Sequence, residues 1–283
     1  MKNLIGIHAL VWSGTWNVTD IEKSIKLSKN LGYDLIEIPL LDPFNFDIKN
    51  TKKYLDRYKL NSVTSLGLSA ETDISSPEDQ HRANGKKILE KALEMTSDLG
   101  SDYMGGVLYS ALAKYHHPPN KESKKRSSEI LHDLSVKAKI YGIKIGLEPV
   151  NRYESNLINT AQQAIDFINM ADSDNLYVHL DSYHMNIEES DYIQPIILCD
   201  DKLGYFHIGE NHRGYLGEGH INFPEIKKGF DQIGYKGPVT FESFSSTVVD
   251  PKLSNILGVW RNLWTDSYDL AKKSKQFLDE NFK

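Results

Sequence analysis

The stretch IKIGLEPVNRYESN, residues 143–156, shows on a small scale how this chain is built. Its first half is apolar at Ile143, Ile145 and Leu147, as in a buried β-strand, and a polar loop begins at Asn151. Glu148 stands where the strand run ends. Burying a carboxylate is costly unless it is paired, hydrogen-bonded or bound to a cation. The stretch therefore predicts a strand with a functional acid at its carboxyl end.

Similar apolar runs recur along the whole chain and alternate with longer segments of helical period. Together with 143–150, they cover residues 4–12, 33–40, 61–68, 102–109, 175–181, 202–209 and 237–243. Eight strand runs, each followed by a helix-like segment, predict an α/β fold that forms a single (β/α)8 TIM barrel. A doubly wound open sheet is the alternative that this alternation leaves open.

The segments between the runs carry helix start and stop signals. Segment 18–32 has Thr19 or Asp20 as a candidate cap, segment 76–100 has Ser76-Pro77, and further helices are expected at 127–142, 159–171 and 222–234. Residues 115–128 read as a loop. No linker divides the chain, so we expect one domain over 1–283 with a C-terminal helical extension over about 251–283.

Composition narrows the class of protein. The 283 residues are 40% hydrophobic and 25% charged, close to globular averages, and the net charge of −6 gives no support to a nucleic-acid partner. The single cysteine, Cys199, ends an apolar run and is expected to be a packed thiol in a reducing compartment. No stretch reaches about 18 apolar residues, so no membrane partner is expected. These features predict a cytoplasmic protein.

Four polar residues occupy corresponding places on the last four strand runs. Glu148, Asp181, His207 and Glu242 lie at or near the run ends, with separations of 33, 26 and 35 residues. Active groups of such folds collect at the carboxyl ends of the strands, and three clustered carboxylates would repel one another without a cation. Three oxygen donors and one imidazole suit Mn²⁺, Mg²⁺ or Co²⁺. The spacing predicts one divalent metal site.

A second set of polar residues follows in the loops after these strands. Glu154, His184 and Arg213 lie six, three and six residues beyond Glu148, Asp181 and His207. Together they would supply charged donors and acceptors for a polyhydroxylated ligand. The glycine-rich run GENHRGYLGEGH, residues 209–220, matches neither a P-loop nor a dinucleotide fingerprint and is interpreted as a shaped loop over the mouth.

Four motifs carry a resemblance to a known family: LEPVNRYESNLINTAQQA, VHLDSYHMNIEE, FHIGENHRGYLGEGHINF, and TFESFSS followed by VWRNLW. They resemble the ketose 3-epimerases of the D-tagatose, D-psicose (allulose) and L-ribulose group, within the xylose-isomerase-like barrel superfamily. The resemblance implies a (β/α)8 barrel, a homodimer or homotetramer, and one divalent metal, commonly Mn²⁺. It also implies the metal ligands Glu148, Asp181, His207 and Glu242, the acid–base pair Glu148 and Glu242, and substrate contacts from Glu154, His184 and Arg213.

The expected reaction is inversion of C3 in a free ketose, through a metal-stabilised cis-enediolate that one glutamate forms and the other reprotonates. An aldose–ketose isomerase, a hydroxypyruvate-type isomerase or an inosose-type dehydratase on the same barrel is the nearest alternative. An endonuclease IV-like phosphodiesterase would need more histidine ligands and a basic face. A sugar-binding barrel without catalysis would not need both glutamates at the metal.

Overall fold

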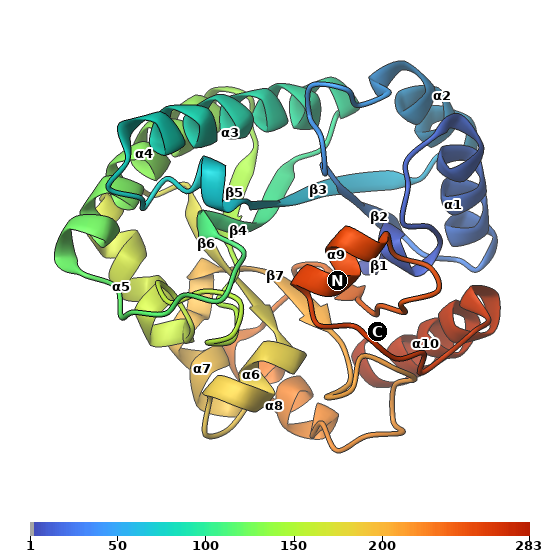
Figure 1. The fold of residues 1–283 in the computed structure, drawn as a ribbon. Coiled ribbons are helices and arrows are strands. Elements are labelled where there is room, and N and C mark those ends of the chain that lie inside the picture. The colour runs from blue at the N-terminus through green and yellow to red at the C-terminus, as the bar shows by residue number, and fades with distance from the viewer. Residues whose placement is uncertain (1–2) are drawn as a thin grey trace.

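A computed structural model describes residues 3–283 and contains a closed barrel of eight parallel strands in chain order (Figure 1). The strands are β1 (Ile5–His8), β2 (Leu35–Pro39), β3 (Asn61–Leu68), β4 (Tyr103–Ala111), β5 (Lys144–Leu147), β6 (Leu176–Asp181), β7 (Leu203–Ile208) and β8 (Val239–Phe241). Because β1 pairs with β8, the predicted (β/α)8 barrel is confirmed and the open sheet is excluded.

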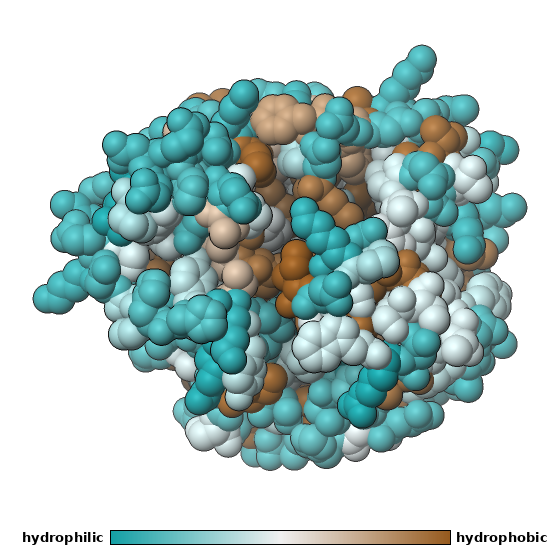
Figure 2. Space-filling view, in the orientation of Figure 1, coloured by the Kyte–Doolittle hydropathy of each residue, from teal (hydrophilic) through white to brown (hydrophobic). Residues whose placement is uncertain are grey.

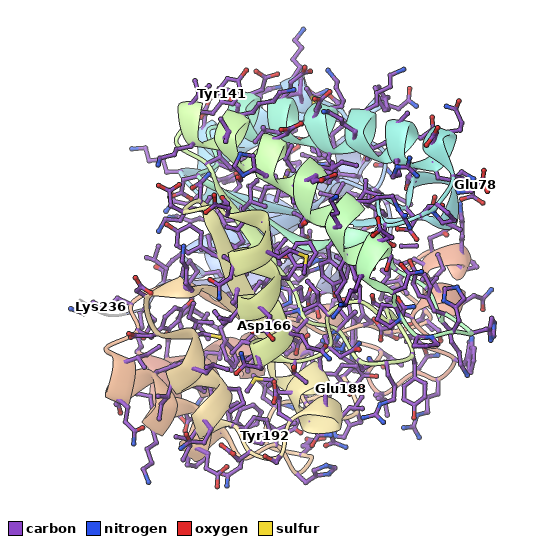
Figure 3. The ribbon with its side chains drawn as sticks, turned by 90° about the vertical axis from the view of Figure 1, so that its left-hand side faces the viewer. Glu78, Tyr141, Asp166, Glu188, Tyr192 and Lys236 are labelled. Atoms are coloured by element: carbon purple, nitrogen blue, oxygen red, sulfur yellow. The ribbon has the colours of Figure 1, made fainter. Side chains whose placement is uncertain are left out.

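Helices surround the barrel (Figure 1). They are α1 (Val18–Asn30), α2 (Ile48–Tyr58), α3 (Asp79–Leu99), α4 (Lys121–Ile140), α5 (Ala161–Ala171), α6 (Ser182–Glu188), α7 (Ile193–Cys199), α8 (Phe223–Ile233), α9 (Pro251–Ile256) and α10 (Ser267–Phe282), with short 3₁₀ turns at Ala9–Val11, Ala70–Thr72 and Asp200–Lys202. Figure 3 shows the two ends of the barrel: Glu78, which follows β3, lies opposite Lys236, which precedes β8.

Two helix starts differ from the sequence-based expectation. The N-cap of α1 is Asn17, whose side chain accepts from the backbone N–H groups of Thr19 and Asp20. Asn is among the preferred N-caps because its side-chain oxygen satisfies these free donors. In α3 the first helical residue is Asp79 after Glu78, so the expected start at Ser76-Pro77 was too early.

The start of α4 is the larger correction, because residues 121–128 of the segment expected to be a loop are helical. The helix begins at Lys121 and is capped by Asn120, whose side chain accepts from the N–H of Ser123. The Ser123 hydroxyl in turn accepts from the Asn120 N–H, which completes a capping box. The cluster of basic residues at 121–126 had concealed this capping signal.

The apolar core lies between the barrel and its helices, where Cys199 is buried as expected. In the C-terminal segment, α10 packs against α8, β1 and β8 on the outside of the barrel. The short helix α9 instead lies over the barrel, near β1 in the view of Figure 1. The chain after β8 therefore supplies both an outer helix and a cover for part of the mouth.

Candidate active site

Strand order and register bring the four predicted ligand residues together. Asp181 and His207 are direct partners across β6 and β7, while Glu148 and Glu242 come one residue after β5 and β8. One ligand atom from each residue lies within 4.8 Å of the others, and all four side chains are buried. The four residues therefore form one cluster, as the strand-end spacing predicted.

His207 is at the centre of this cluster. Its Nδ1 lies 3.6 Å from Glu148 Oε1, 3.5 Å from Glu242 Oε1 and 3.9 Å from Asp181 Oδ2, and it makes no hydrogen bond within the described residues. Buried polar atoms are normally paired, so an unpaired nitrogen facing three carboxylates needs an explanation. The donor set and this unpaired atom fit a divalent cation, which would be bound by all four residues.

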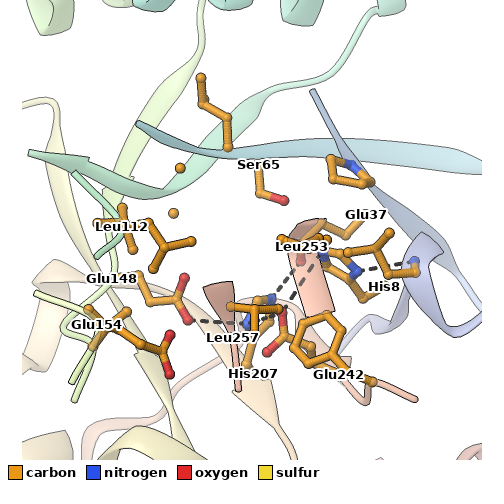
Figure 4. A pocket seen from close by; sticks show the side chains of 18 of the residues that line it. His8, Glu37, Ser65, Leu112, Glu148, Glu154, His207, Glu242, Leu253 and Leu257 are labelled. Atoms are coloured by element: carbon orange, nitrogen blue, oxygen red, sulfur yellow. Dashed lines mark hydrogen bonds and ion pairs between the residues drawn. The ribbon is translucent and has the colours of Figure 1, made fainter. Parts of the chain in front are cut away.

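Two residues of the cluster were missed in the sequence analysis. Glu37 on β2 accepts a hydrogen bond from Nε2 of His207 at 2.7 Å, and His8 at the end of β1 lies 3.5 Å from Glu37. His8 also lies 3.9 Å from Glu242. Figure 4 shows His8, Glu37, His207 and Glu242 side by side in the pocket. The strand-end rule missed His8 because the first apolar run was expected to extend to residue 12, whereas β1 ends at His8.

His179, also on β6, lies against the same cluster. Its ring centroid is 4.2 Å from that of His207, and in the described structure neither of its ring nitrogens has a hydrogen-bond partner. With Glu148 and His207 it forms a second group that could hold a cation. The two groups share Glu148 and His207, so they are not independent metal sites. The four-residue group has more oxygen donors and is the better match for a hard cation.

Arg213, predicted to bind substrate, contacts the cluster directly. Its Nη1 donates to Asp181 at 2.9 Å and to Glu242 at 2.5 Å, and its guanidinium carbon lies 4.0 Å from the ring centre of Tyr183. Arg213 is not glycine, yet its backbone φ is +61°, in the left-handed region that few side chains adopt. The loop is therefore shaped to bring this side chain back over the cluster.

His184 and Glu154 lie beside Arg213, and Asn151 connects them. The backbone N–H and the side-chain amide of Asn151 lie 3.2 and 3.0 Å from His184 Nδ1, and the same amide donates to Glu154 at 2.8 Å. Since Nδ1 of His184 accepts, its Nε2 carries the hydrogen and lies 3.8 Å from Glu148 Oε1. All three predicted substrate contacts thus line the pocket.

A buried carboxylate holds the glycine-rich loop that carries Arg213. The side chain of Glu210 accepts from the backbone N–H groups of Asn211 at 3.1 Å and Gly217 at 3.0 Å. His212 accepts from the N–H of Gly214 and belongs to neither metal-ligand group. The interpretation of residues 209–220 as a shaped loop is thereby confirmed, and Glu210 is the residue that shapes it.

The electrostatic environment separates the two glutamates expected to act as acid and base. Burial, together with the charges of Glu242 and Asp181, raises the pKa of Glu148 to about 8, despite the opposing effect of His207. Burial acts on Glu242 in the same direction, but His207 and Arg213 outweigh it and lower its pKa. Two carboxyls with pKa values pushed apart are typical of an acid–base pair.

The pocket above the cluster encloses about 600 Å³, including its open mouth. One side carries the polar cluster, and the other is apolar and is formed by Leu10, Pro39, Leu41, Leu66, Val107, Leu112, Val150, Phe244, Leu253 and Leu257. In Figure 2 hydrophobic residues are visible inside the central hollow, whose rim is mostly hydrophilic. At the wall, Gly106 has φ +113°, and a Cβ there would lie 2.4 Å from the Leu66 carbonyl oxygen. A polar floor with an apolar wall suits a small polar ligand with one reacting end.

Comparisons with known proteins identify the family of this chain. The xylose isomerase-like TIM barrel family matches residues 25–279. L-ribulose 3-epimerase from Methylomonas sp. (strain DH-1) is 47% identical over 277 residues, which are 98% of this chain and 97% of the relative. Ketose 3-epimerase from Arthrobacter globiformis is 43% identical over 274 residues, which are 97% and 95% of the two chains. The crystal structure of Methylomonas sp. D-allulose 3-epimerase in complex with D-allulose has a TM-score of 0.97 at 46% identity and covers 99% of this chain and 98% of its own.

The closed barrel and the acid–imidazole cluster at the carboxyl ends of its strands define an enzyme of the xylose isomerase-like TIM barrel family. Within that family, the chain belongs to the ketose 3-epimerases and is an epimerase. No helix among residues 3–283 is long and apolar enough to cross a membrane.

Proposed function

We propose that this enzyme inverts C3 of free ketoses and that Glu148 and Glu242 exchange the proton. The observation that carries the proposal is that these two glutamates, on β5 and β8, converge with Asp181 and His207 on one point of the pocket floor. Relatives with 47% and 46% identity are named for L-ribulose and D-allulose, so we propose these two ketoses as substrates.

The cluster would hold one divalent cation, with Mn²⁺ as the proposed ion and Mg²⁺ or Co²⁺ as compatible ones. When bound, such a cation polarises the C2 carbonyl of the ketose and makes the hydrogen on C3 more acidic. The charged Arg213 guanidinium and the neutral Nε2–H of His184 would donate to the hydroxyls at the reacting end of the sugar, and Glu154 would accept from them. The apolar wall would then hold the far end of the sugar.

Epimerisation requires one group to remove the C3 proton from one face and another to return a proton from the opposite face. Glu242, whose pKa is lowered, is ionised and suited to accept a proton. The pKa of Glu148 is raised to about 8 in the metal-free site, and Glu148 must lose this proton to bind the cation, so in the loaded enzyme it returns to C3 a proton that it takes up during turnover. After one turnover the two have exchanged roles, and the reverse reaction uses them in the opposite order.

The test is an assay of the metal-free and Mn²⁺-supplemented enzyme with L-ribulose, D-allulose, D-fructose and D-tagatose, with products separated by chromatography. We expect the C3 epimer of each accepted ketose, and no activity after chelation. An aldose product would instead support the aldose–ketose isomerase. Turnover without exchange of solvent deuterium into C3 would overturn the proton-transfer mechanism.

We also propose a homodimer or homotetramer, which the resemblance to ketose 3-epimerases implies, and a single domain, because no linker divides the sequence. Light scattering coupled to gel filtration measures the first, and the number of calorimetric unfolding transitions measures the second.

A further inference from the structure

A carboxylate from the opposite side of the barrel contacts the proposed metal ligand His207. Glu37 lies on β2 and is 170 residues away in sequence, but barrel closure places its Oε2 2.7 Å from Nε2 of His207. The side chain of Glu37 is only 1% exposed. An ionised carboxylate can only accept hydrogen bonds, so Nε2 of His207 must carry the hydrogen.

The other nitrogen of the same ring faces the proposed metal site. Nδ1 of His207 has no hydrogen-bond partner in the described structure and lies 3.5 Å from Glu242 and 3.6 Å from Glu148. The ring is therefore held at one nitrogen by Glu37, while the other nitrogen points to the carboxylates. Rotation of the His207 ring about its Cβ–Cγ bond would break the 2.7 Å hydrogen bond between Nε2 and Glu37.

A second histidine lies beside the other carboxylate oxygen of Glu37, without a hydrogen bond to it. The backbone N–H of Leu10 donates to Nδ1 of His8 at 3.2 Å, so Nε2 of His8 carries the hydrogen. That nitrogen faces Oε1 of Glu37 at 3.5 Å. Glu37 thus lies between two imidazoles, with one oxygen directed to each (Figure 4).

We propose that Glu37 is the positioning residue of the metal site: it fixes the tautomer and orientation of His207 so that Nδ1 is free to bind the cation. This inference rests on the proposed function, because it requires a cation at the cluster. Metal-bound histidines commonly donate their second N–H to a carboxylate, and removal of that carboxylate typically costs about 10–100-fold in metal affinity. Neither the spacing of the ligands nor the family resemblance had indicated this residue.

The test measures Mn²⁺ affinity by titration calorimetry of the metal-free protein. For Glu37→Met, which has no acceptor but a similar length, we expect a dissociation constant about 10–100-fold higher than that of the wild type. Glu37→Gln keeps a neutral acceptor, so its dissociation constant for Mn²⁺ should lie between those of the wild type and Glu37→Met. The control Thr64→Val removes a buried hydroxyl that bonds Thr96 on the outside of the barrel wall and should bind Mn²⁺ as the wild type does.

The outcomes separate this inference from the proposed function. A folded Glu37→Met variant that binds Mn²⁺ within twofold of the wild type would overturn only the role of Glu37, whereas a wild type that binds no divalent cation would overturn both proposals. If the Met variant does not fold, nitrogen-15 spectra of ring-labelled histidine in the Mg²⁺-loaded wild type decide the question. We expect the His207 hydrogen on Nε2, and a hydrogen on Nδ1 would refute the inference.

Discussion

Arg213 donates through Nη1 to Oε2 of Glu242 at 2.5 Å. A residue proposed to hold the substrate is therefore already bound to one of the two proposed acid–base groups. The same nitrogen lies 2.9 Å from Asp181, so one guanidinium compensates two of the three carboxylates in the cluster. Arg213 therefore contributes to the charge balance of this pocket, in addition to any cation that the cluster binds.

Arg213→Ala should destabilise the metal-free protein strongly. Asp181 and Glu242 would remain buried without their partner, which typically costs about 3–5 kcal/mol in the free energy of unfolding. Mn²⁺ should recover part of this loss, because it compensates the same carboxylates, whereas kcat/KM should fall about 10²-fold as the sugar loses its alignment. Thermal unfolding with and without Mn²⁺ measures the first effect, and steady-state kinetics the second.

The control for this variant is Arg57→Ala. The Arg57–Glu22 pair is 3.4 Å long and its arginine is 62% exposed, so its loss should change stability by no more than about 1 kcal/mol. Equal losses in the two variants would contradict the role given to Arg213.

Glu148→Gln and Glu242→Gln should each lower kcat by about 10²–10⁴-fold, because each removes one of the two proton-transfer groups. The variants should still exclude water and fold, since Gln has nearly the same shape as Glu. Glu189→Gln is a suitable control, because this half-buried carboxylate accepts from the Ala161 N–H and does not line the pocket. Near wild-type turnover in either site variant would remove that glutamate from the mechanism.

Cation affinity should weaken as the pH falls from 8 to 6. The pKa of Glu148 is raised to about 8 and that of Asp181 to about 6, mainly by burial, and both must lose their protons to bind a metal. Between the unfolded carboxyl values of about 4 and these raised values, the metal-free native state binds more protons than the unfolded state. Metal-free stability should therefore decline as the pH rises over this interval.

The stabilisation by Mn²⁺ should accordingly increase from pH 6 to pH 8. The measurement is the difference in Tm between Mn²⁺-loaded and chelator-treated protein across that range. A difference that stays constant with pH would show that these two carboxyls do not titrate when the cation binds.

Glu210→Ala should loosen the loop at residues 209–220. The carboxylate accepts from the Asn211 and Gly217 N–H groups, which are partly open to solvent, so losing these two hydrogen bonds should cost about 0.5–1.5 kcal/mol each. Because this loop sets the backbone of Arg213, we expect kcat/KM to fall while Mn²⁺ affinity changes little. Hydrogen exchange of the Gly217 amide measures the loosening, and unchanged exchange would refute the role of Glu210.

The sequence was sufficient to predict the barrel and the cluster, because both follow from local periodicity. The cluster residues lie at the carboxyl ends of four consecutive strands, and each is about one strand–helix repeat from the next. Adjacent strands of the barrel therefore bring together Glu148, Asp181, His207 and Glu242. Glu37 was not found this way, because its contact with His207 requires the closure of the barrel across 170 residues. A strand-end scan alone does not reveal which interior side chain of β2 faces β7.

The residues that form the apolar wall of the pocket could not be predicted from the hydrophobic periodicity of the sequence either. Leu253 and Leu257 reach the pocket from α9 and the turn after it. The path of this segment depends on tertiary packing, as in the hydrogen bond from the Trp264 indole to Ser243. Helical periodicity predicts that such a segment is a helix, but not the face of the barrel on which it lies.

Most of the apolar wall comes from outside the strands that carry the four clustered residues, although Val150 and Phe244 follow β5 and β8. The proposed chemistry depends on β5 to β8, while Leu66, Val107 and Leu253 come from β3, β4 and α9. Substitutions in the wall can therefore accumulate during evolution without disturbing proton transfer. Enzymes that descend from one ancestral barrel can thus come to prefer different sugars while they keep the same reaction. Laboratory selection for a new sugar should begin at Leu66, Val107 and Leu253.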